Sequence, residues 1–537
     1  METNKRYDRF GIMLDCSRNG VMKVEKVKLL MDYMHKMGYN ALELYAEDVY
    51  EVEGEPYLGY MRGRYTGEEL KELDCYAQKL GIELIPCIQT LAHFSAFVKN
   101  DGCYDMVDTA DILLIGDDRT YKFIDNIFAS LAKNFTSRQV NIGMDEAHMV
   151  GLGKYLDKNG YRNRFDILLE HLKKVAQIAK KYGFKAHMWS DMFFRVVNNG
   201  VYCSSKVIEV PERVKKAVPD GVDLVYWDYY QTQKEGYDVM FKSHEGFNGQ
   251  TWFAGCAWCQ FGFAPFHTTT LKTMEPAMKS VIEHGVKNVL ITLWGDNGRE
   301  CSPFTVLPAL YTIRRFADGF FDCEEIQKEF NQKFGLNYQD FVALELPNKV
   351  IANEFNEKTK SANPCKSLLY QDPFMGLIDS ELDKFKPIPY GEHAKLLFEK
   401  VKTAGEFSYV FDSMAKLCYA LEIKATLGVK TREIYKSSDK GHIPALIKDY
   451  EELVVRLQDF HKAFYNLWMT DNNPQGWEVQ DLRLGGLICR VKTCALRLQE
   501  YLDGKILKIQ ELEEDLLPYL WGLANHNYNL IVSRSVL

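Results

Sequence analysis

The first 300 residues repeat one short unit, in which a stretch of helical character ends in glycine and an apolar run follows directly. Glycine suits the left-handed position after a helix, and such apolar runs are typical of strands buried on both faces. Three further runs, FGIMLDCSR, QVNIGMDEAH and TWFAGCAW, bring the expected strands to eight. The five full copies are MGYNALELYAED, LGIELIPCIQTLAH, YGFKAHMWSD, DGVDLVYWDYY and HGVKNVLITLWGDN, with Gly38, Gly81, Gly183, Gly221 and Gly285 as their glycines.

Amphipathic stretches of helical period lie between the apolar runs, for example VEKVKLLMDYMHKM and RFDILLEHLKKVAQIAKKY. Another, EELKELDCYAQKL, begins with Thr66 and Glu69 at a capping-box spacing. Eight strands alternating with helices over this length are typical of an α/β fold of the (β/α)8 TIM-barrel type, which we predict for residues 1–330. A doubly wound open sheet is the alternative, although no GxGxxG or GxxxxGK[ST] loop follows any run.

The pattern changes after residue 330. Stretches such as IPALIKDYEELVVRLQDFHKAFYNLWM carry helical periodicity without alternation, so we predict an α-helical C-terminal domain over 331–537. One segment, TDNNPQGWEVQDLRLGG at 470–486, contains turn residues around Trp477, Asp481 and Arg483, and we expect an ordinary connecting loop there. A loop that reaches over the barrel mouth or a neighbouring subunit is the alternative. The C-terminal domain either supports the barrel or mediates self-association into a homo-oligomer, and both readings stay open.

Charge and composition exclude several classes of partner. The net charge of −8 arises from 66 basic and 74 acidic residues without a block of like charge, so we expect no nucleic-acid surface. No apolar stretch reaches the roughly 20 residues of a membrane span, so we expect no membrane partner. The segment METNKRYDRF lacks the apolar core of a secretion signal, and with 13 cysteines this predicts reduced thiols and a cytoplasmic location.

Cys256 and Cys259 form a CxxC spacing, but no second CxxC or histidine pair accompanies it. A zinc site needs about four such ligands. We therefore expect buried thiols here, and no metal or other cofactor.

Polar and aromatic side chains close the apolar runs. In a parallel barrel the carboxyl ends of the strands meet at one mouth, so these side chains should converge on a single bowl. Tryptophan and tyrosine stack on sugar rings while acids and arginine hold hydroxyls, which predicts a sugar site. The converging residues are Asp15, Arg18, His93, Asp145, Glu146, Trp189, Asp191, Trp227, Asp228, Tyr229, Tyr230, Trp258, Trp294 and Asp296.

Structural roles are the alternatives for several of these residues. Each tryptophan could simply fill the barrel, Asp15 could pair with Arg18, and His93 could be a buried histidine bonded to a carbonyl group. The adjacent acids Asp145 and Glu146 are harder to explain in this way, because burying two acids is costly without partners or a task.

The adjacency of Asp145 and Glu146 predicts unequal roles. Neighbouring residues on a strand point to opposite faces, so the two acids would not flank one bond as the carboxylates of an ordinary retaining glycosidase do. Where the strand turns into a loop, the second acid can swing over a substrate while the first stays tucked against it. One acid could then protonate a leaving group while the other grips a different part of the same sugar.

NIGMDEAH resembles the Asp-Glu signature on the fourth strand of glycoside hydrolase family 20, the β-N-acetylhexosaminidases. FGIMLDCSR resembles the family's first-strand segment with its sugar-binding arginine, here Arg18, and IPCIQTLAH resembles the third-strand segment that ends in His93. HMWSDM is similar to the fifth-strand segment with Trp189, VYWDYYQ to the sixth-strand segment that supplies a tyrosine, and TLWGDN to the eighth-strand segment with Trp294 and an acid, Asp296.

The resemblance implies exo-acting, retaining hydrolysis of terminal non-reducing β-linked GlcNAc, with GalNAc as a second candidate. The nucleophile is then the carbonyl oxygen of the substrate's own 2-acetamido group, which closes into an oxazoline-like intermediate. It implies Glu146 as general acid and base and Asp145 as the partner of the acetamide N–H, with either Tyr229 or Tyr230 on the acetamide oxygen. The expected substrate-binding residues are Arg18, His93, Trp189, Trp227, Trp258, Trp294 and Asp296.

Three departures from the family pattern stand out. The α/β domain that precedes the barrel in most relatives has no counterpart before the first predicted strand. Asp296 stands where glutamate is common, which shortens the reach to the sugar hydroxyls and loosens discrimination at C4. The helical C-terminal domain is not a general feature of the family.

Other functions remain as alternatives. The main one is a metal-dependent TIM-barrel sugar isomerase or epimerase, with Asp145, Glu146, His148 and His187 as ligands. A sugar-binding protein on a catalytically silent barrel is another. DEAH at 145–148 also occurs in RNA helicases, but the chain lacks their phosphate loop and basic surface.

Overall fold

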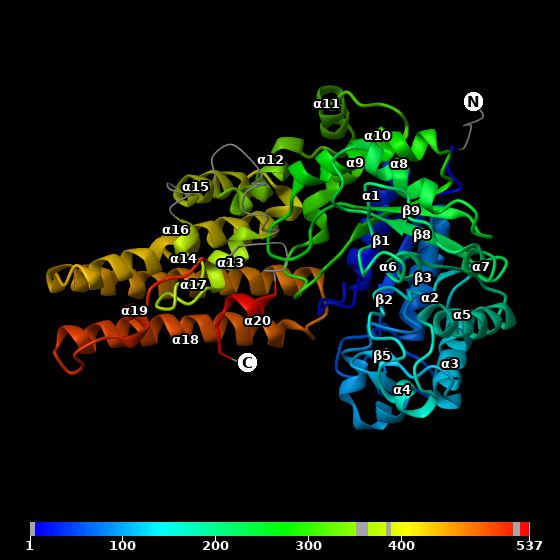
Figure 1. Ribbon diagram of the computed structural model, residues 1–537. Helices are drawn as coiled ribbons and strands as arrows, with labels where there is room; N and C mark the ends of the chain where they lie inside the picture. Colours follow the sequence, from blue (N-terminus) through cyan, green and yellow to red (C-terminus); the bar gives the residue numbers. More distant parts are fainter. Residues whose placement is uncertain (1–5, 351–362, 383–387, 519–526, 536–537) are drawn as a thin grey trace.

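A computed structural model describes residues 6–350, 363–382, 388–518 and 527–535. Residues 1–5, where the N-terminal segment discussed above begins, lie outside these ranges. Eight parallel strands close into a barrel in the order β1-β10-β9-β8-β7-β6-β3-β2, which confirms the barrel and rules out the open sheet (Figure 1). Their bounds are β1 Arg9–Asp15, β2 Ala41–Ala46, β3 Glu83–Ile88, β6 Gln139–Asn141, β7 Lys185–Trp189, β8 Asp223–Trp227, β9 Thr251–Cys256 and β10 Asn288–Leu293.

Helices cover the outside of this barrel (Figure 1). The five glycines of the repeated unit all have φ between +64° and +87°, the left-handed region that glycine adopts without a steric penalty. Thr66 and Glu69 form the expected capping box at the start of α2. The helices are α1 Val24–Met37, α2 Gly67–Lys79, α3 Asp118–Asn134, α5 Arg164–Lys181, α6 Asp191–Arg195, α7 Glu212–Lys215, α8 Lys234–Ser243, α9 His267–Glu283 and α10 Leu307–Ala317.

The loop after β3 carries a small insertion that the sequence did not predict. Two short antiparallel strands, β4 Val107–Thr109 and β5 Ile112–Leu113, lie beside α4 Lys154–Asn159. Asp108 connects them, because its carboxylate accepts hydrogen bonds from the N–H groups of Gly151 and Tyr155. The insertion therefore joins the loop after β3 to the loop after β6.

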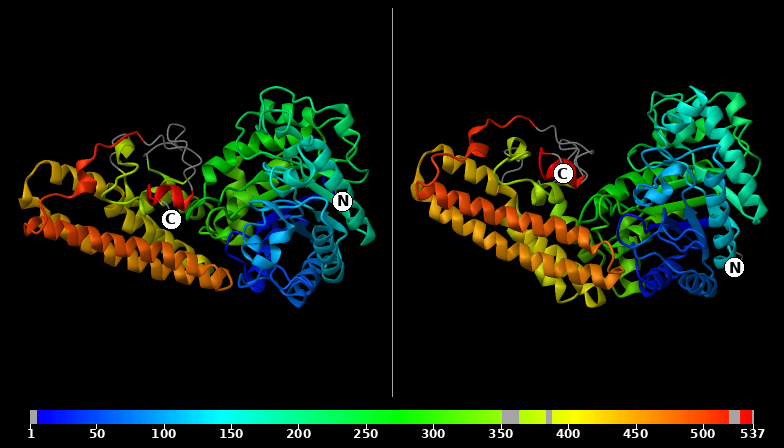
Figure 2. Two further views of the ribbon diagram at one scale, coloured as in Figure 1. Left: turned by 60° about the horizontal axis from the view of Figure 1, so that its bottom comes forward. Right: turned by 90° about the horizontal axis from the view of Figure 1, so that it is seen from below.

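Long helices make up most of the C-terminal part and extend away from the barrel (Figures 1 and 2). They are α16 Ser408–Lys436, α17 Ile443–Asp471 and α18 Trp477–Leu502, which pack in sequence order. Helix α11 Cys323–Phe334 packs against α10 at the barrel (Figure 1). The other short helices of the C-terminal part are α12 Tyr338–Val342, α13 Pro364–Tyr370, α14 Asp379–Leu382, α15 Tyr390–Val401, α19 Gln510–Glu513 and α20 Tyr528–Ile531. This confirms a helical C-terminal domain, while its boundary at residue 330 stays a prediction. No helix in the described ranges is long and apolar enough to span a membrane.

The expected loop at 470–486 is wrong for most of its length. Helix α18 begins at Trp477, whose ring is buried against Phe464 and Trp468 of α17, and the helix continues through Asp481 and Arg483. Only the turn between α17 and α18 is irregular. The segment also contacts the barrel, since Asn473 donates a hydrogen bond to the carbonyl oxygen of Gly63. The packing of the buried Trp477 ring stabilises the helix here, although turn-forming residues precede it.

Candidate active site

A cavity of about 250 Å³ opens at the carboxyl ends of the strands. Four of the residues predicted to converge on the bowl do not line it, namely Asp15, Asp191, Asp228 and Trp258, and the first three are buried carboxylates near the site. Gln260 and Phe261, which sequence reasoning missed, line the cavity as well. Trp258 is buried behind the wall, where its Nε1 donates to the carbonyl oxygen of Tyr229 at 3.2 Å, so its predicted place in the bowl is wrong. The predicted residues that line the cavity are Arg18, His93, Asp145, Glu146, Trp189, Trp227, Tyr229, Tyr230, Trp294 and Asp296.

The segment NIGMDE leaves the barrel earlier than a regular strand would. Strand β6 ends at Asn141, and Gly143, Met144 and Glu146 all have positive φ, between +49° and +70°. A side chain at Gly143 would place its Cβ 2.1 Å from Oε1 of Gln89, so only glycine fits there. This turn places Asp145 in the wall of the cavity, while Glu146 stays accessible with 42% of its side chain exposed.

The carboxylate of Asp145 is buried between two partners. Nε2 of Gln89 donates to its Oδ1 at 2.8 Å, and Nε2 of His93 lies 3.1 Å from its Oδ2. Burial acts to raise the pKa of Asp145, but the imidazole of His93 and the amide of Gln89 outweigh it and lower that pKa below its ordinary value. Asp145 is therefore an anion at neutral pH, and His93 pairs with a carboxylate rather than with a carbonyl group.

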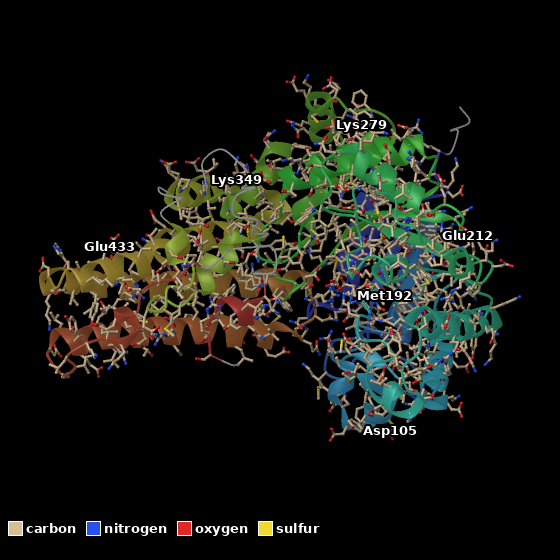
Figure 3. All side chains as sticks on the ribbon, in the orientation of Figure 1. Asp105, Met192, Glu212, Lys279, Lys349 and Glu433 are labelled. Atoms are coloured by element: carbon tan, nitrogen blue, oxygen red, sulfur yellow. The ribbon has the colours of Figure 1, made fainter. Side chains whose placement is uncertain are left out.

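Asp191 and Arg195 lie behind Glu146. Asp191 begins α6, whose next residue, Met192, is labelled in Figure 3, and its Oδ2 accepts the backbone N–H of Glu146 at 3.1 Å. Nη2 of Arg195 lies 3.3 Å from Oε1 of Glu146, and its Nε donates to Asp191 at 2.9 Å. Burial and the nearby charge of Asp145 raise the pKa of Asp191 to about 7, against the opposing effect of Arg195.

Arg18 is surrounded by three carboxylates in the wall of the cavity. Its guanidinium lies 3.4 Å from Asp15, 3.1 Å from Glu47 and 2.8 Å from Asp296. The predicted pairing of Asp15 with Arg18 is thus one contact among three. The guanidinium also lies over the ring of Trp294, which adds a cation–π contact. Arg18 is therefore held in a fixed orientation with Asp296 beside it.

Aromatic rings form the remaining wall. Trp227 stacks on Tyr229 with 5.3 Å between ring centres, and Nε1 of Trp294 donates to the hydroxyl of Tyr229 at 3.0 Å. Trp189 is buried, and within the described part of the chain its Nε1 has no hydrogen-bond partner. The two candidate tyrosines differ sharply, because Tyr229 is 6% exposed and Tyr230 is 48% exposed. Only Tyr229 belongs to the enclosed part of the cavity.

The sequence contained only weak indications of the other residues at the site, Glu47, Gln89 and Arg195. Glu47 follows the second apolar run and Gln89 closes the third, so both met the same strand-end rule that selected the others. Arg195 lies one helical turn beyond Asp191, and its contact with Glu146 depends on the fold of α6.

The four proposed metal ligands are not gathered together. Nε2 of His187 lies 2.6 Å from Glu43 inside the barrel, where its ring stacks on Trp252. Among the described residues there is no group of three or more His, Cys, Asp or Glu side chains placed to hold a metal ion. All thirteen cysteines, Cys256 and Cys259 included, are free thiols.

The arrangement combines one accessible acid, a neighbouring buried anion and a pocket walled by aromatic rings. An accessible acid can deliver a proton to a leaving group, and a buried anion can stabilise positive charge that develops beside it. The aromatic walls suit the apolar faces of a sugar or of an amide substituent.

Two family models match this chain. Residues 7–260 match the glycosyl hydrolase family 20 catalytic domain, and residues 339–529 match the glycoside hydrolase 20C C-terminal domain. A β-hexosaminidase of Vibrio furnissii is 27% identical over an alignment that covers 26% of this chain and 29% of that protein. The chain thus aligns with less than a third of that relative's length.

Solved structures of similar proteins include two hexosaminidases. The exo-β-N-acetylglucosaminidase of Vibrio harveyi, in complex with N-acetylglucosamine, has 15% identity and a TM-score of 0.46, with 64% of this chain and 58% of that chain covered. The N-acetyl-β-hexosaminidase of Streptomyces plicatus has 19% identity and a TM-score of 0.45, with 62% and 70% covered.

Proposed function

Since the chain belongs to glycosyl hydrolase family 20, we propose that it is an exo-β-N-acetylhexosaminidase. It removes terminal non-reducing β-linked GlcNAc, and also GalNAc, from short soluble oligosaccharides or glycoconjugate fragments. The observation that carries this proposal is that two adjacent acids differ in burial and in their partners. Asp145 is buried and paired with His93 and Gln89, whereas Glu146 is accessible at the same cavity.

Glu146 acts first as the general acid and then as the general base. It is accessible from the cavity and its backbone N–H is tied to Asp191, so the carboxyl group can reach the glycosidic oxygen while its main chain stays fixed. The same group then removes a proton from the incoming water molecule, which gives retention at the anomeric carbon.

Asp145 supports the nucleophile, which is the carbonyl oxygen of the substrate's own 2-acetamido group. As that oxygen attacks the anomeric carbon, positive charge develops on the amide nitrogen. The lowered pKa of Asp145 keeps a negative charge beside the amide N–H throughout the reaction. A preorganised anion of this kind stabilises the transition state more than the ground state.

Tyr229 holds the acetamide oxygen. Its hydroxyl lies in the cavity wall and accepts the indole N–H of Trp294, so the hydroxyl can donate its own proton to a substrate oxygen. Trp189, Trp227 and Trp294 enclose the acetamide methyl group and the sugar ring. Tyr230 lies on the exposed rim instead.

Arg18 and Asp296 bind the outer hydroxyls of the terminal sugar. The three carboxylates around Arg18 fix its guanidinium, and Asp296 remains partly exposed to the cavity. These contacts with the outer hydroxyls of the terminal sugar account for exo action. We also propose a cytoplasmic location, which agrees with thirteen free thiols.

An assay with three compounds tests the proposal. The enzyme should cleave aryl β-N-acetylglucosaminide, leave aryl β-glucoside almost untouched, and bind a thiazoline mimic of the cyclic intermediate tightly. Equal cleavage of the two glycosides, or indifference to the thiazoline, would contradict the proposed function.

A further inference from the structure

The loop that follows β10 has a strained backbone directly behind the site. Asn297, Gly298 and Arg299 have φ of +61°, +134° and +54° in succession. Such conformations persist only where the surroundings hold them. Trp294 and Asp296, which line the cavity, immediately precede this stretch. Whatever holds the strained stretch therefore also fixes the wall of the cavity.

A buried ion cluster lies at the end of this loop. Glu300 is fully buried, with its Oε2 2.7 Å from Nζ of Lys366 and its Oε1 2.9 Å from Nη1 of Arg483. We call Glu300, Lys366 and Arg483 the mouth cluster. Both cations come from C-terminal helices, Lys366 from α13 and Arg483 from α18. Removing one partner of a buried pair leaves an uncompensated charge, which is strongly destabilising locally.

The same two cations also form hydrogen bonds with the backbone of the strained stretch. Nζ of Lys366 donates to the carbonyl oxygen of Asn297 at 2.9 Å, and Nη1 of Arg483 donates to that oxygen at 2.8 Å. Nε2 of Gln480 donates to the carbonyl oxygen of Gly298 at 3.0 Å. A Cβ at Gly298 would lie 2.6 Å from Nη1 of Arg483, so the close approach requires glycine. The C-terminal helices thus bind the loop through its main chain.

A second mouth loop is held from the same helix. Nδ2 of Asn363, directly before α13, donates to the carbonyl oxygen of Phe261, and Phe261 lines the cavity. A Cβ at Gly262 would lie 2.4 Å from Oδ1 of Asn363. Helix α13 and the residue before it therefore connect two separate walls of one cavity.

We propose that Lys366, Arg483 and Glu300 are positioning residues, through which the C-terminal helical domain holds Trp294 and Asp296 in the geometry that binds the terminal sugar. Only the expected effect on enzyme kinetics rests on the proposed function. The contacts that hold the loop after β10 do not depend on it. The domain is then a structural part of the active site rather than an appended module, although neither Lys366 nor Arg483 lines the cavity.

The kinetic test uses Arg483→Gln and Lys366→Met in the full-length enzyme. Each should lower kcat/KM for aryl β-N-acetylglucosaminide about ten- to a hundredfold, chiefly through KM, because small displacements of positioning groups have effects of this size. Arg483→Lys keeps the charge next to Glu300 but loses the fork that reaches Asn297, so its defect should be intermediate. The pH profile should keep its shape in all three variants, since Glu146 and Asp145 are untouched.

Tyr33→Phe is the matched control. The hydroxyl of Tyr33 in α1 donates to Glu406 of the C-terminal domain at 3.1 Å, and neither residue lines the cavity. The variant removes a hydrogen bond between the same two domains and should leave kcat/KM within about twofold. Unchanged KM in Arg483→Gln, or an equal loss in Tyr33→Phe, would overturn the proposal.

Hydrogen–deuterium exchange provides a readout that needs no substrate. Amide exchange over residues 294–303 should be faster in Arg483→Gln than in wild type, while exchange across the β6 turn stays unchanged. If wild-type enzyme does not cleave the aryl N-acetylglucosaminide, the proposed function fails while this measurement still tests the mouth cluster. Unchanged exchange over 294–303 in both cation variants would overturn the positioning role itself.

Discussion

His93 and Asp145 face each other at the cavity wall, with Nε2 of the imidazole 3.1 Å from Oδ2 of the carboxylate. Burial acts to lower the pKa of His93, but the charge of Asp145 outweighs it and raises that pKa to about 10. The pair is therefore imidazolium and carboxylate at neutral pH. This keeps Asp145 anionic next to the position we assign to the acetamide group.

The His93 pair predicts a pH-dependent contribution to stability. A raised pKa stabilises the folded protein fully below pH 6.5, the ordinary value, and this contribution is lost as the pH rises through about 10. Asp145 stays charged over that range, because its pKa is lowered. The difference in free energy of unfolding between wild type and His93→Gln, measured by denaturant titration, should shrink from pH 6 to pH 10. A difference that is constant with pH would contradict the ion pair.

Glu146→Gln removes the proton donor while it preserves the shape of the side chain. We expect kcat to fall by about two to four orders of magnitude, with binding of the thiazoline mimic retained. An aryl leaving group of low pKa needs little protonation, so the first chemical step should be less impaired for a dinitrophenyl glycoside than for a methylumbelliferyl one. Equal defects in that step for both leaving groups would exclude Glu146 as the acid.

Tyr229→Phe and Tyr230→Phe form a matched pair. Tyr229 is buried in contact with Trp227 and Trp294, whereas Tyr230 lies on the rim. Loss of one hydrogen bond that strengthens in the transition state costs about tenfold to a thousandfold, so kcat/KM should fall by this amount only in Tyr229→Phe. Tyr230→Phe should remain within about threefold of wild type. The reverse order would assign the acetamide oxygen to Tyr230.

Arg18→Lys should raise KM at least about tenfold, because a lysine presents a point charge where a planar fork is needed. Arg119→Lys is the matched control, since Nη1 of Arg119 donates to Glu55 at 2.8 Å and Arg119 does not line the cavity. Initial rates with aryl β-N-acetylglucosaminide give both KM values. A normal KM in Arg18→Lys would remove Arg18 from the sugar-binding wall.

The barrel and most of the cavity lining could be predicted from the sequence because both depend on local patterns. Gly38 and the four equivalent glycines mark helix ends, and residues that close apolar runs meet at one mouth. Trp258 followed the same pattern and yet lies behind the wall, because the loop after β9 turns its ring toward the backbone of Tyr229. Strand-end position alone does not give side-chain direction.

The contacts between domains had no local signal. Glu300 and Arg483 lie 183 residues apart, and their pairing depends on how α18 docks against the loop after β10. Helix α18 itself was missed at its start, because Asn472 to Gly476 favour a turn while the buried ring of Trp477 begins the helix. Both the Glu300–Arg483 pair and the start of α18 depend on packing between residues that are distant in the sequence.

The central claim is that the substrate's own amide is the nucleophile. Its most direct test is the rate of hydrolysis for aryl glucosaminides whose N-acyl group carries zero, one, two or three fluorine atoms. Each fluorine makes the carbonyl oxygen a weaker nucleophile with little change in size, so kcat/KM should fall steeply along the series. Rates that stay constant across the four substrates would show that another group attacks the anomeric carbon.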